Sequence, residues 1–91
     1  MATNQSVISG VARDPTGLPV ADARVYFISG PAPLPEIAAL TDGSGKFSLT
    51  APAGGVYQIK CAADGFASAT ATVNVKNGLD VQVEIRLKRS T

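Results

Sequence analysis

Apolar and polar residues alternate with a period of two along most of this chain of 91 residues. Because successive side chains of a β-strand point to opposite faces, this period predicts strands with one buried and one solvated face. Residues 67–76 and 79–88 show the pattern most clearly, and Asn77-Gly78 between them is a strong signal for a two-residue hairpin turn. In the second run the inward positions are Leu79, Val81, Val83, Ile85 and Leu87.

Five earlier segments carry the same signal, and the third of them is the weakest. They span residues 7–13, 23–27, 36–41, 46–49 and 56–61. Turn signals rich in glycine, aspartate and proline lie at 14–19, 41–45 and 63–66. No window has the period of a helix, so the pattern predicts seven strands in two facing sheets. Inward positions in these segments are Ile8, Gly10, Ala12, Ala23, Val25, Phe27, Phe47, Leu49, Tyr57, Ile59 and Cys61.

The length is that of one domain, which we place at residues 7–89. Residues 1–6 are expected to form a flexible N-terminal segment, and residues 90–91 a short tail. Gly10 faces inward, where we expect a side chain to collide with the facing sheet. Cys61 is the only cysteine, so no internal disulfide forms, and its inward position predicts a buried, inert thiol.

Composition narrows the classes of partner. Charged residues make up 16% of the chain, against roughly 25% in an average domain, which suggests that some surface is covered by a partner. The net charge is +1 without a basic stripe, so nucleic acid is not expected. No apolar run approaches the length needed to cross a bilayer, and no membrane insertion is expected. Residues 1–6 lack the features of a signal peptide, which predicts a cytoplasmic protein if the chain is complete and a surface or secreted one if it is part of a longer protein.

Catalysis is not expected. The chain has no histidine, so neither a Ser-His nor a Cys-His nucleophile pair can form. The only glutamates, Glu36 and Glu84, are far apart in sequence, and the aspartates lie in turn signals. We therefore predict a chain that is not an enzyme and that needs no cofactor.

Four short motifs follow one another along the chain. They are residues 8–25 with Gly17 and Pro19-Val20, then Thr41–Leu49, Pro52–Tyr57 and Gly65-Phe66. In order and spacing these motifs resemble carboxypeptidase regulatory-like domains over most of the chain. The resemblance implies an all-β fold, namely a seven-stranded antiparallel Greek-key β-sandwich of the transthyretin-like kind. Domains of this family accompany zinc carboxypeptidases, outer-membrane receptors, surface adhesins and tail-like injection machinery as non-catalytic parts. The resemblance therefore implies a structural, spacer or protein-interaction module.

The aspartates of three turns form one candidate site. If successive strands alternate in direction, the loops of Asp14, Asp42 and Asp64 fall at the same end of the sandwich. Each aspartate is expected to accept hydrogen bonds from the amides of its own turn. The alternative is that the three together bind a hard cation such as calcium through carboxylate oxygens.

The proline-rich segment from Gly30 to Glu36 is the candidate partner-binding loop, because stiff apolar loops lose little entropy on binding. Its candidate residues are Pro31, Pro33, Leu34 and Pro35. By the same direction argument it lies at the other end of the sandwich, near residues 52–55 and 77–78. The alternative is that Leu34 and Ile37 fold back over the core as a lid.

Tyr26 completes the set of candidate partner-binding residues, since inward placement of Phe27 leaves Tyr26 outward. The predicted partner is another protein or domain of the same assembly, with self-association through an edge strand as a further expectation. The alternative function is a carbohydrate-binding accessory module of a surface or secreted protein, for which Tyr26 would be the stacking ring.

Overall fold

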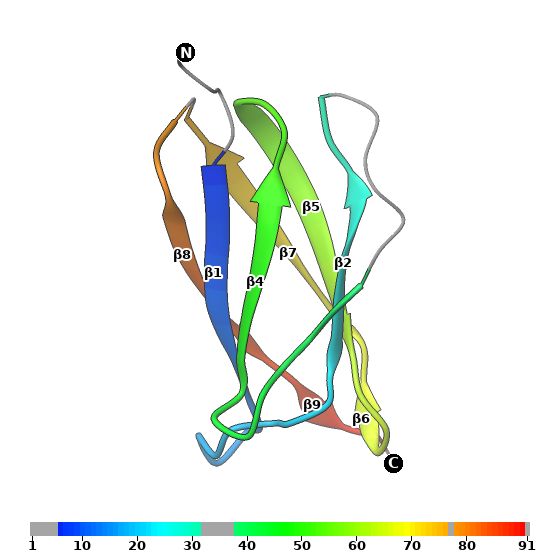
Figure 1. The fold of residues 1–91 in the computed structure, drawn as a ribbon. Coiled ribbons are helices and arrows are strands. Elements are labelled where there is room, and N and C mark those ends of the chain that lie inside the picture. The colour runs from blue at the N-terminus through cyan, green and yellow to red at the C-terminus, as the bar shows by residue number, and fades with distance from the viewer. Residues whose placement is uncertain (1–5, 32–37, 77, 91) are drawn as a thin grey trace.

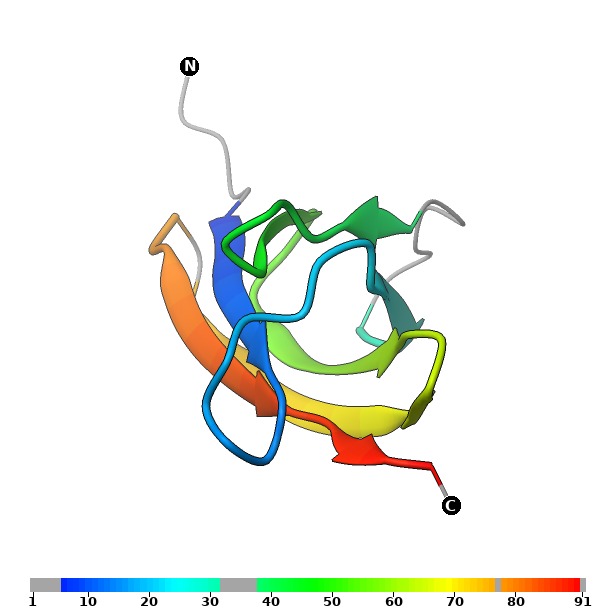
Figure 2. The ribbon, with the colours of Figure 1, turned by 90° about the horizontal axis from the view of Figure 1, so that it is seen from below.

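The computed structural model describes residues 6–31, 38–76 and 78–90, and these form two packed β-sheets and no helix (Figure 1). The strands are β1 (Ser6–Arg13), β2 (Arg24–Ser29), β3 (Ala39–Leu40), β4 (Lys46–Ala51), β5 (Gly55–Ala62), β6 (Phe66–Ala67), β7 (Ala69–Val75), β8 (Val81–Arg86) and β9 (Lys88–Arg89). Sheet A has the order β4-β1-β8 and sheet B the order β3-β2-β5-β7, while β6 and β9 form a small separate ladder. Seen from below, the strands surround one interior (Figure 2).

The predicted all-β sandwich is confirmed, with two differences in detail. The pairing of β1 with β8 is parallel, whereas we expected antiparallel pairing throughout; the other ladders are antiparallel. The predicted last strand is also divided: Leu87, whose backbone N–H donates to the Arg13 carbonyl at 2.8 Å, lies between β8 and β9. The chain then leaves sheet A to pair with β6.

The alternating pattern places the core where it was predicted. Along β5, Tyr57, Ile59 and Cys61 are fully buried, and along β4 every second residue is buried. Two inward predictions, at the starts of their runs, are wrong: Leu79 is 58% exposed, because it lies in the turn before β8 begins, and Ala67 of β6 is exposed. The buried apolar residues are Ile8, Ala12, Val20, Ala23, Val25, Phe47, Leu49, Ala51, Tyr57, Ile59, Cys61, Val73, Val75, Ile85 and Leu87.

A side chain at Gly10 would collide with a neighbour in the same sheet, whereas we expected a collision with the facing sheet. A Cβ at this position would lie 2.4 Å from Cζ of Phe47 and 2.7 Å from the carbonyl oxygen of Val83. Phe47 is the cross-strand partner of Gly10 within sheet A, so its ring covers the glycine from the neighbouring strand and not from the facing sheet. The collision is therefore between strands of one sheet.

The turns gather at two ends of the sandwich. The β1–β2, β3–β4 and β5–β6 connections lie at the lower end in Figure 1, and the β4–β5 and β7–β8 connections lie at the upper end. The turns of Asp14, Asp42 and Asp64 therefore share the lower end, as the alternation of strand direction predicted. Within the described ranges, no helix is long and apolar enough to cross a membrane.

Candidate functional site

The outer face of sheet B presents the most distinctive set of exposed side chains. We call it the outer B face, and it is formed by Arg24, Tyr26, Ile28, Leu40, Val56, Gln58, Lys60, Thr70, Thr72 and Asn74. These residues share one face because each alternates with a core position along its strand. The register between strands then sets which of them are neighbours.

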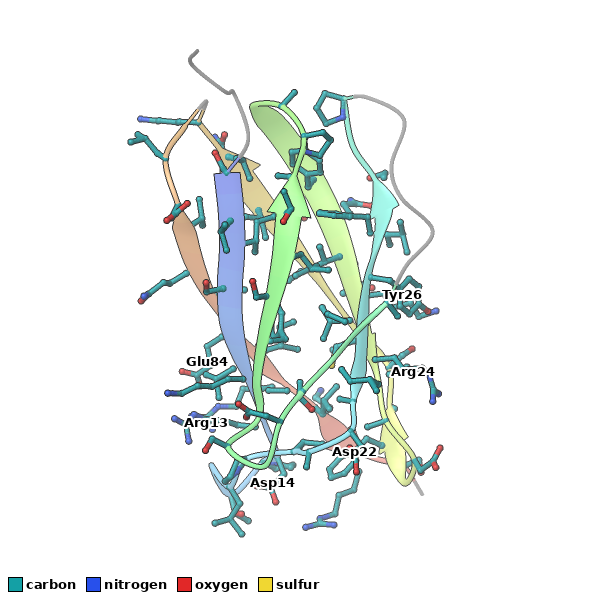
Figure 3. The ribbon with its side chains drawn as sticks, viewed as in Figure 1. Arg13, Asp14, Asp22, Arg24, Tyr26 and Glu84 are labelled. Carbon is teal, nitrogen blue, oxygen red and sulfur yellow. The ribbon has the colours of Figure 1, made fainter. Side chains whose placement is uncertain are left out.

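Tyr26 lies near the middle of this face. It pairs with Lys60 of β5, and directly opposite residues of an antiparallel pair have Cβ atoms roughly 5 Å apart. Arg24 precedes it by two residues on the same face, opposite Leu40. Figure 3 shows the side chains of Tyr26 and Arg24 on the same side of the sandwich, pointing away from the core. A half-buried aromatic ring is thus bordered by two cations.

Apolar side chains continue the face on either side of Tyr26. Ile28, Leu40 and Val56 are 46%, 62% and 56% exposed, which is unusual for residues of this size. Ile28 stands out from the strand because the β2–β5 register shifts between Phe27 and Ser29. A β-bulge of this kind redirects side chains at a sheet edge.

The charge on the outer B face has one sign. Its members, as far as the chain is described, include Arg24 and Lys60 and no carboxylate. The exposed ion pair of Glu84 with Arg86 lies on β8, in the other sheet. The face therefore combines an aromatic ring, exposed apolar groups and positive charge, a combination suited to contact with another macromolecule.

The proline-rich loop is described only at its start. Pro31 follows β2, and its ring fills the space beside Gly55, where an added Cβ would lie 2.7 Å from Pro31 Cγ. This contact places Pro31, the described start of the loop, beside the β4–β5 connection. Pro33, Leu34 and Pro35, with Ile37, lie outside the described residues. Pro31 and Tyr26 belong to the same strand and its extension, but Pro31 is at the end of the sheet and Tyr26 near the middle of its face.

The Asp14 carboxylate holds the β1–β2 turn together. Its Oδ1 accepts hydrogen bonds from the Thr16 hydroxyl at 2.7 Å and from the amides of Thr16 and Leu18 at 2.9 and 3.0 Å. Its Oδ2 lies 3.4 Å from an Arg89 guanidinium nitrogen. The hydrogen bond from the Thr16 hydroxyl is the largest cause that lowers the pKa of Asp14 below its ordinary value of 3.8, while burial acts in the opposite direction.

Asp42 does the same for the β3–β4 turn. Its Oδ1 accepts from the amides of Lys46 and Ser44, each at 2.9 Å, and the Lys46 amide is the largest cause that lowers the pKa of Asp42. Asp64 lies in the exposed turn before β6. No three acidic, cysteine or histidine residues come together as a metal-ligand group in residues 6–31, 38–76 and 78–90. The carboxylates of Asp14 and Asp42 are used by their own turns.

Acid should therefore weaken the fold through these turns. A carboxylate whose pKa is lower in the folded than in the unfolded chain stabilises the fold above its unfolded pKa, and that contribution is lost as the pH falls through the folded pKa. We expect the free energy of unfolding to decrease as the pH is lowered below about 4. The Asp14→Asn variant keeps an oxygen acceptor but does not titrate, so it should lose less on acidification.

Urea unfolding measured from neutral pH to about pH 2.5 tests this expectation. Thr16→Val, which removes only the hydroxyl donor, should lie between the wild type and Asp14→Asn in its acid dependence. An Asp14→Asn variant that loses as much stability in acid as the wild type would show that this carboxylate does not contribute.

Thr41 is a structural residue that the sequence did not reveal. Its hydroxyl donates to the Val20 carbonyl at 2.7 Å and accepts from the Ala23 amide at 2.9 Å, and the residue is almost completely buried. It thereby ties the β1–β2 connection to the end of β3. A threonine beside a predicted turn carries no sign of this role, because the bond partners are about twenty residues away.

Cys61 and a hollow on sheet A are two places in the described structure where reactive side chains lie. Burial raises the pKa of the Cys61 thiol, which is fully buried as predicted and remains a thiol at neutral pH. A hollow of about 380 Å³ on sheet A is lined, among the described residues, by Ser9, Gly10, Val11, Lys46, Phe47, Gln82 and Val83, of which only Lys46 is ionisable. Cys61 belongs to the apolar core, and no hydrogen bond joins Ser9 to Lys46 in the described hollow.

Comparison with known proteins gives a family and a set of similar folds. Residues 7–88 match the family described as "Carboxypeptidase regulatory-like domain". No curated protein matches the chain. Among solved structures, the major pilin subunit of Bacillus cereus matches with a TM-score of 0.77 and 14% sequence identity. The match covers 94% of this chain and 29% of the pilin chain.

Two further structures show how widely the fold occurs. A cohesin–X-dockerin complex from Acetivibrio cellulolyticus has a TM-score of 0.69 at 18% identity, covering 92% of this chain and 58% of that one. Hydroxyquinol 1,2-dioxygenase from Pseudomonas putida has a TM-score of 0.73 at 8% identity, covering 99% of this chain and 58% of the enzyme. The chain spans less than two thirds of each of these proteins, and at such identities the likeness establishes the fold alone.

Proposed function

The chain belongs to the carboxypeptidase regulatory-like domain family, and from this membership we propose that it is a non-catalytic β-sandwich module, a structural, spacer or protein-interaction domain of a larger protein or assembly. The outer B face is the observation that carries the proposal. It offers Tyr26 with Arg24 and Lys60, surrounded by exposed apolar groups, on a rigid sheet. Tyrosine and arginine at the centre of a protein contact contribute strongly to affinity.

Two further observations support a module that acts by its surface. The carboxylates of Asp14 and Asp42 and the hydroxyls of Thr41 and Tyr57 are all engaged in bonds that shape turns. The similar pilin subunit and cohesin–X-dockerin complex are parts of protein assemblies. We propose the same kind of role here, with a protein as partner and the proline-rich segment from Gly30 to Glu36 as a second contact region.

The proposal predicts that one face of the chain is needed for capture of a partner. Purified chain is immobilised, the captured protein is identified from an extract of the source, and its dissociation constant is measured. Tyr26→Ala is expected to weaken binding about thirtyfold or more, which corresponds to the loss of about 2 kcal/mol typical of a central tyrosine. Ser48→Ala, on the exposed face of sheet A, is the matched control and should bind as the wild type does.

The outcomes separate the regions proposed. Loss of binding with Leu34→Asp but not with Tyr26→Ala would move the contact to the proline-rich loop. Equal binding by all variants, or turnover of a substrate by the purified chain, would contradict the proposal.

A carbohydrate-binding module is the second candidate, and Tyr26 is the observation that favours it. Of the five aromatic residues, all of them described, Tyr26 alone lies on a sheet's outer face, while Phe66 at the lower end has the Arg89 guanidinium 5.5 Å above its ring. A glycan array bound by the wild type and not by Tyr26→Ala would favour this alternative.

A further inference from the structure

The free edge of sheet B is formed by β7. This strand pairs with β5 along all seven of its residues, from Ala69 opposite Cys61 to Val75 opposite Gly55, without a register shift. It is the last strand in the order of sheet B, so no further strand is hydrogen-bonded to it in the described structure, although β8 contacts it without pairing. An unpaired edge exposes backbone N–H and C=O groups that can bind another strand.

β7 lacks the features that usually protect such an edge. Natural edge strands carry charges, prolines or bulges, or are very short. β7 has no ionisable residue and no proline, and its ladder is continuous. The alternation of threonine and asparagine outward with alanine and valine inward also favours an extended strand.

Each of the other described edge strands is very short or carries a charged residue. β3 has only two residues. β8 carries Glu84 and Arg86, which form an exposed ion pair at 3.0 Å. At the start of β4, both backbone groups of Lys46 are taken by Asp42: the Lys46 amide donates to the carboxylate at 2.9 Å, and the Asp42 amide donates to the Lys46 carbonyl at 3.0 Å. Among the described edges, β7 is the long one without charge.

Thr72 is the central residue of β7, so an antiparallel pair of two β7 strands centred on it obeys two-fold symmetry. Outward, Thr72 would face Thr72 of the other copy, and such threonine pairs are favourable across strands. Inward, Ala71 would face Val73 of the other copy, and Ala69 would face Val75. No like charges would meet, because the strand carries none.

The inward residues of β7 also have room for a neighbour. Val73 and Val75 are each 2% exposed, but Ala69 and Ala71 are only partly buried at the rim of the core. In the symmetric pair each partly buried alanine would lie beside a buried valine of the other copy. Alternation of small and large side chains across a contact allows dense packing.

We propose that β7 is a self-association edge, through which two copies of this chain pair antiparallel about Thr72 and join their four-stranded sheets. The proposal deepens the module function and rests on it, since it names a second copy as one partner. The outer B faces of the two copies would then form one continuous surface with two Tyr26 rings.

The oligomeric state tests the proposal. Sedimentation velocity over a series from low micromolar to near-millimolar chain should show the mass rise from 9.3 kDa towards twice that value. Thr72→Lys places two lysines opposite each other on the symmetry axis, and this variant should stay monomeric throughout. Thr50→Lys makes the same change at an exposed outward position of β4 and should dimerise as the wild type does.

A charge-rescue experiment separates pairing from general damage to the fold. Thr72→Lys and Thr72→Glu should each be monomeric, and a mixture of the two should regain the dimer, because opposite charges then meet on the axis. A wild type that is monomeric at every concentration, a mixture that fails to pair, or a Thr50→Lys variant that loses the dimer would overturn the proposal. The proposed module function is tested separately, because partner capture is measured with the Tyr26→Ala and Ser48→Ala variants. Failure of self-association can therefore be distinguished from failure of partner binding.

Discussion

Replacing Tyr57 by alanine is expected to lower the free energy of unfolding by about 3–5 kcal/mol, the range found when a large aromatic side chain is removed from a core. Tyr57 is fully buried in β5, and its ring lies 5.2 Å from that of Phe27, centroid to centroid. Its cross-strand partner on β7 is Val73, whose smaller side chain cannot fill the space that the ring would leave. Urea unfolding, with the slope checked for two-state behaviour, measures the loss.

The hydroxyl of Tyr57 has a role that a second variant isolates. It donates to the Ala53 carbonyl at 2.5 Å and accepts from the Ala53 amide at 3.1 Å, so it closes the β4–β5 connection onto the core. Tyr57→Phe keeps the ring and leaves both groups of Ala53 without that partner, which should cost about 1–3 kcal/mol. A phenylalanine variant as unstable as the alanine variant would show that the hydrogen bonds, and not the ring, dominate at this position.

The inward positions of the fold could be predicted because strand periodicity is a local property. Tyr57, Ile59 and Cys61 follow from alternation alone, and the structure buries all three. Leu79 continues the same alternation in sequence, but β8 begins only at Val81, so Leu79 remains exposed in the turn. Periodicity cannot say where a strand ends.

Contacts between strands distant in sequence could not be predicted. The parallel pairing of β1 with β8 joins segments about seventy residues apart, and nothing in either segment specifies its partner or direction. The ring of Phe47 over Gly10 depends on the β1–β4 register in the same way. Each of these features requires knowledge of the assembled sheet.

For the candidate site, too, the face on which a side chain lies could be predicted, whereas its neighbours on other strands could not. Outward placement of Tyr26 follows from inward placement of Val25 and Phe27 on β2. The position of Lys60 opposite Tyr26 follows only from the β2–β5 register, so the cationic character of the outer B face appeared with the structure. The turns of Asp14, Asp42 and Asp64 lie at one end as expected, and the carboxylates of Asp14 and Asp42 accept hydrogen bonds from amides of their own turns.

Gly45 occupies a position that no other residue fits. Its φ of +76° lies in the left-handed region, and a Cβ there would be 2.5 Å from the carbonyl oxygen of Ala12. Its own carbonyl accepts the Ala12 amide at 2.8 Å, and its amide donates to the Asp42 carbonyl at 2.9 Å. The glycine is thus held between β1 and the turn that begins β4, and neither neighbour can withdraw without breaking a backbone hydrogen bond.

Gly45→Ala is therefore expected to cost about 2–5 kcal/mol, from the strain of a left-handed alanine and from overpacking against backbone atoms. Gly43, two residues earlier in the same turn, is the matched control. No atom lies within 4 Å of a Cβ built there and its φ is not positive, so Gly43→Ala should change stability by less than about 1 kcal/mol. Parallel urea unfolding of the two variants compares the same chemical change in one turn. Equal effects would mean that the turn tolerates a side chain at position 45, and that the contact between Gly45 and β1 does not hold the lower end of sheet A together.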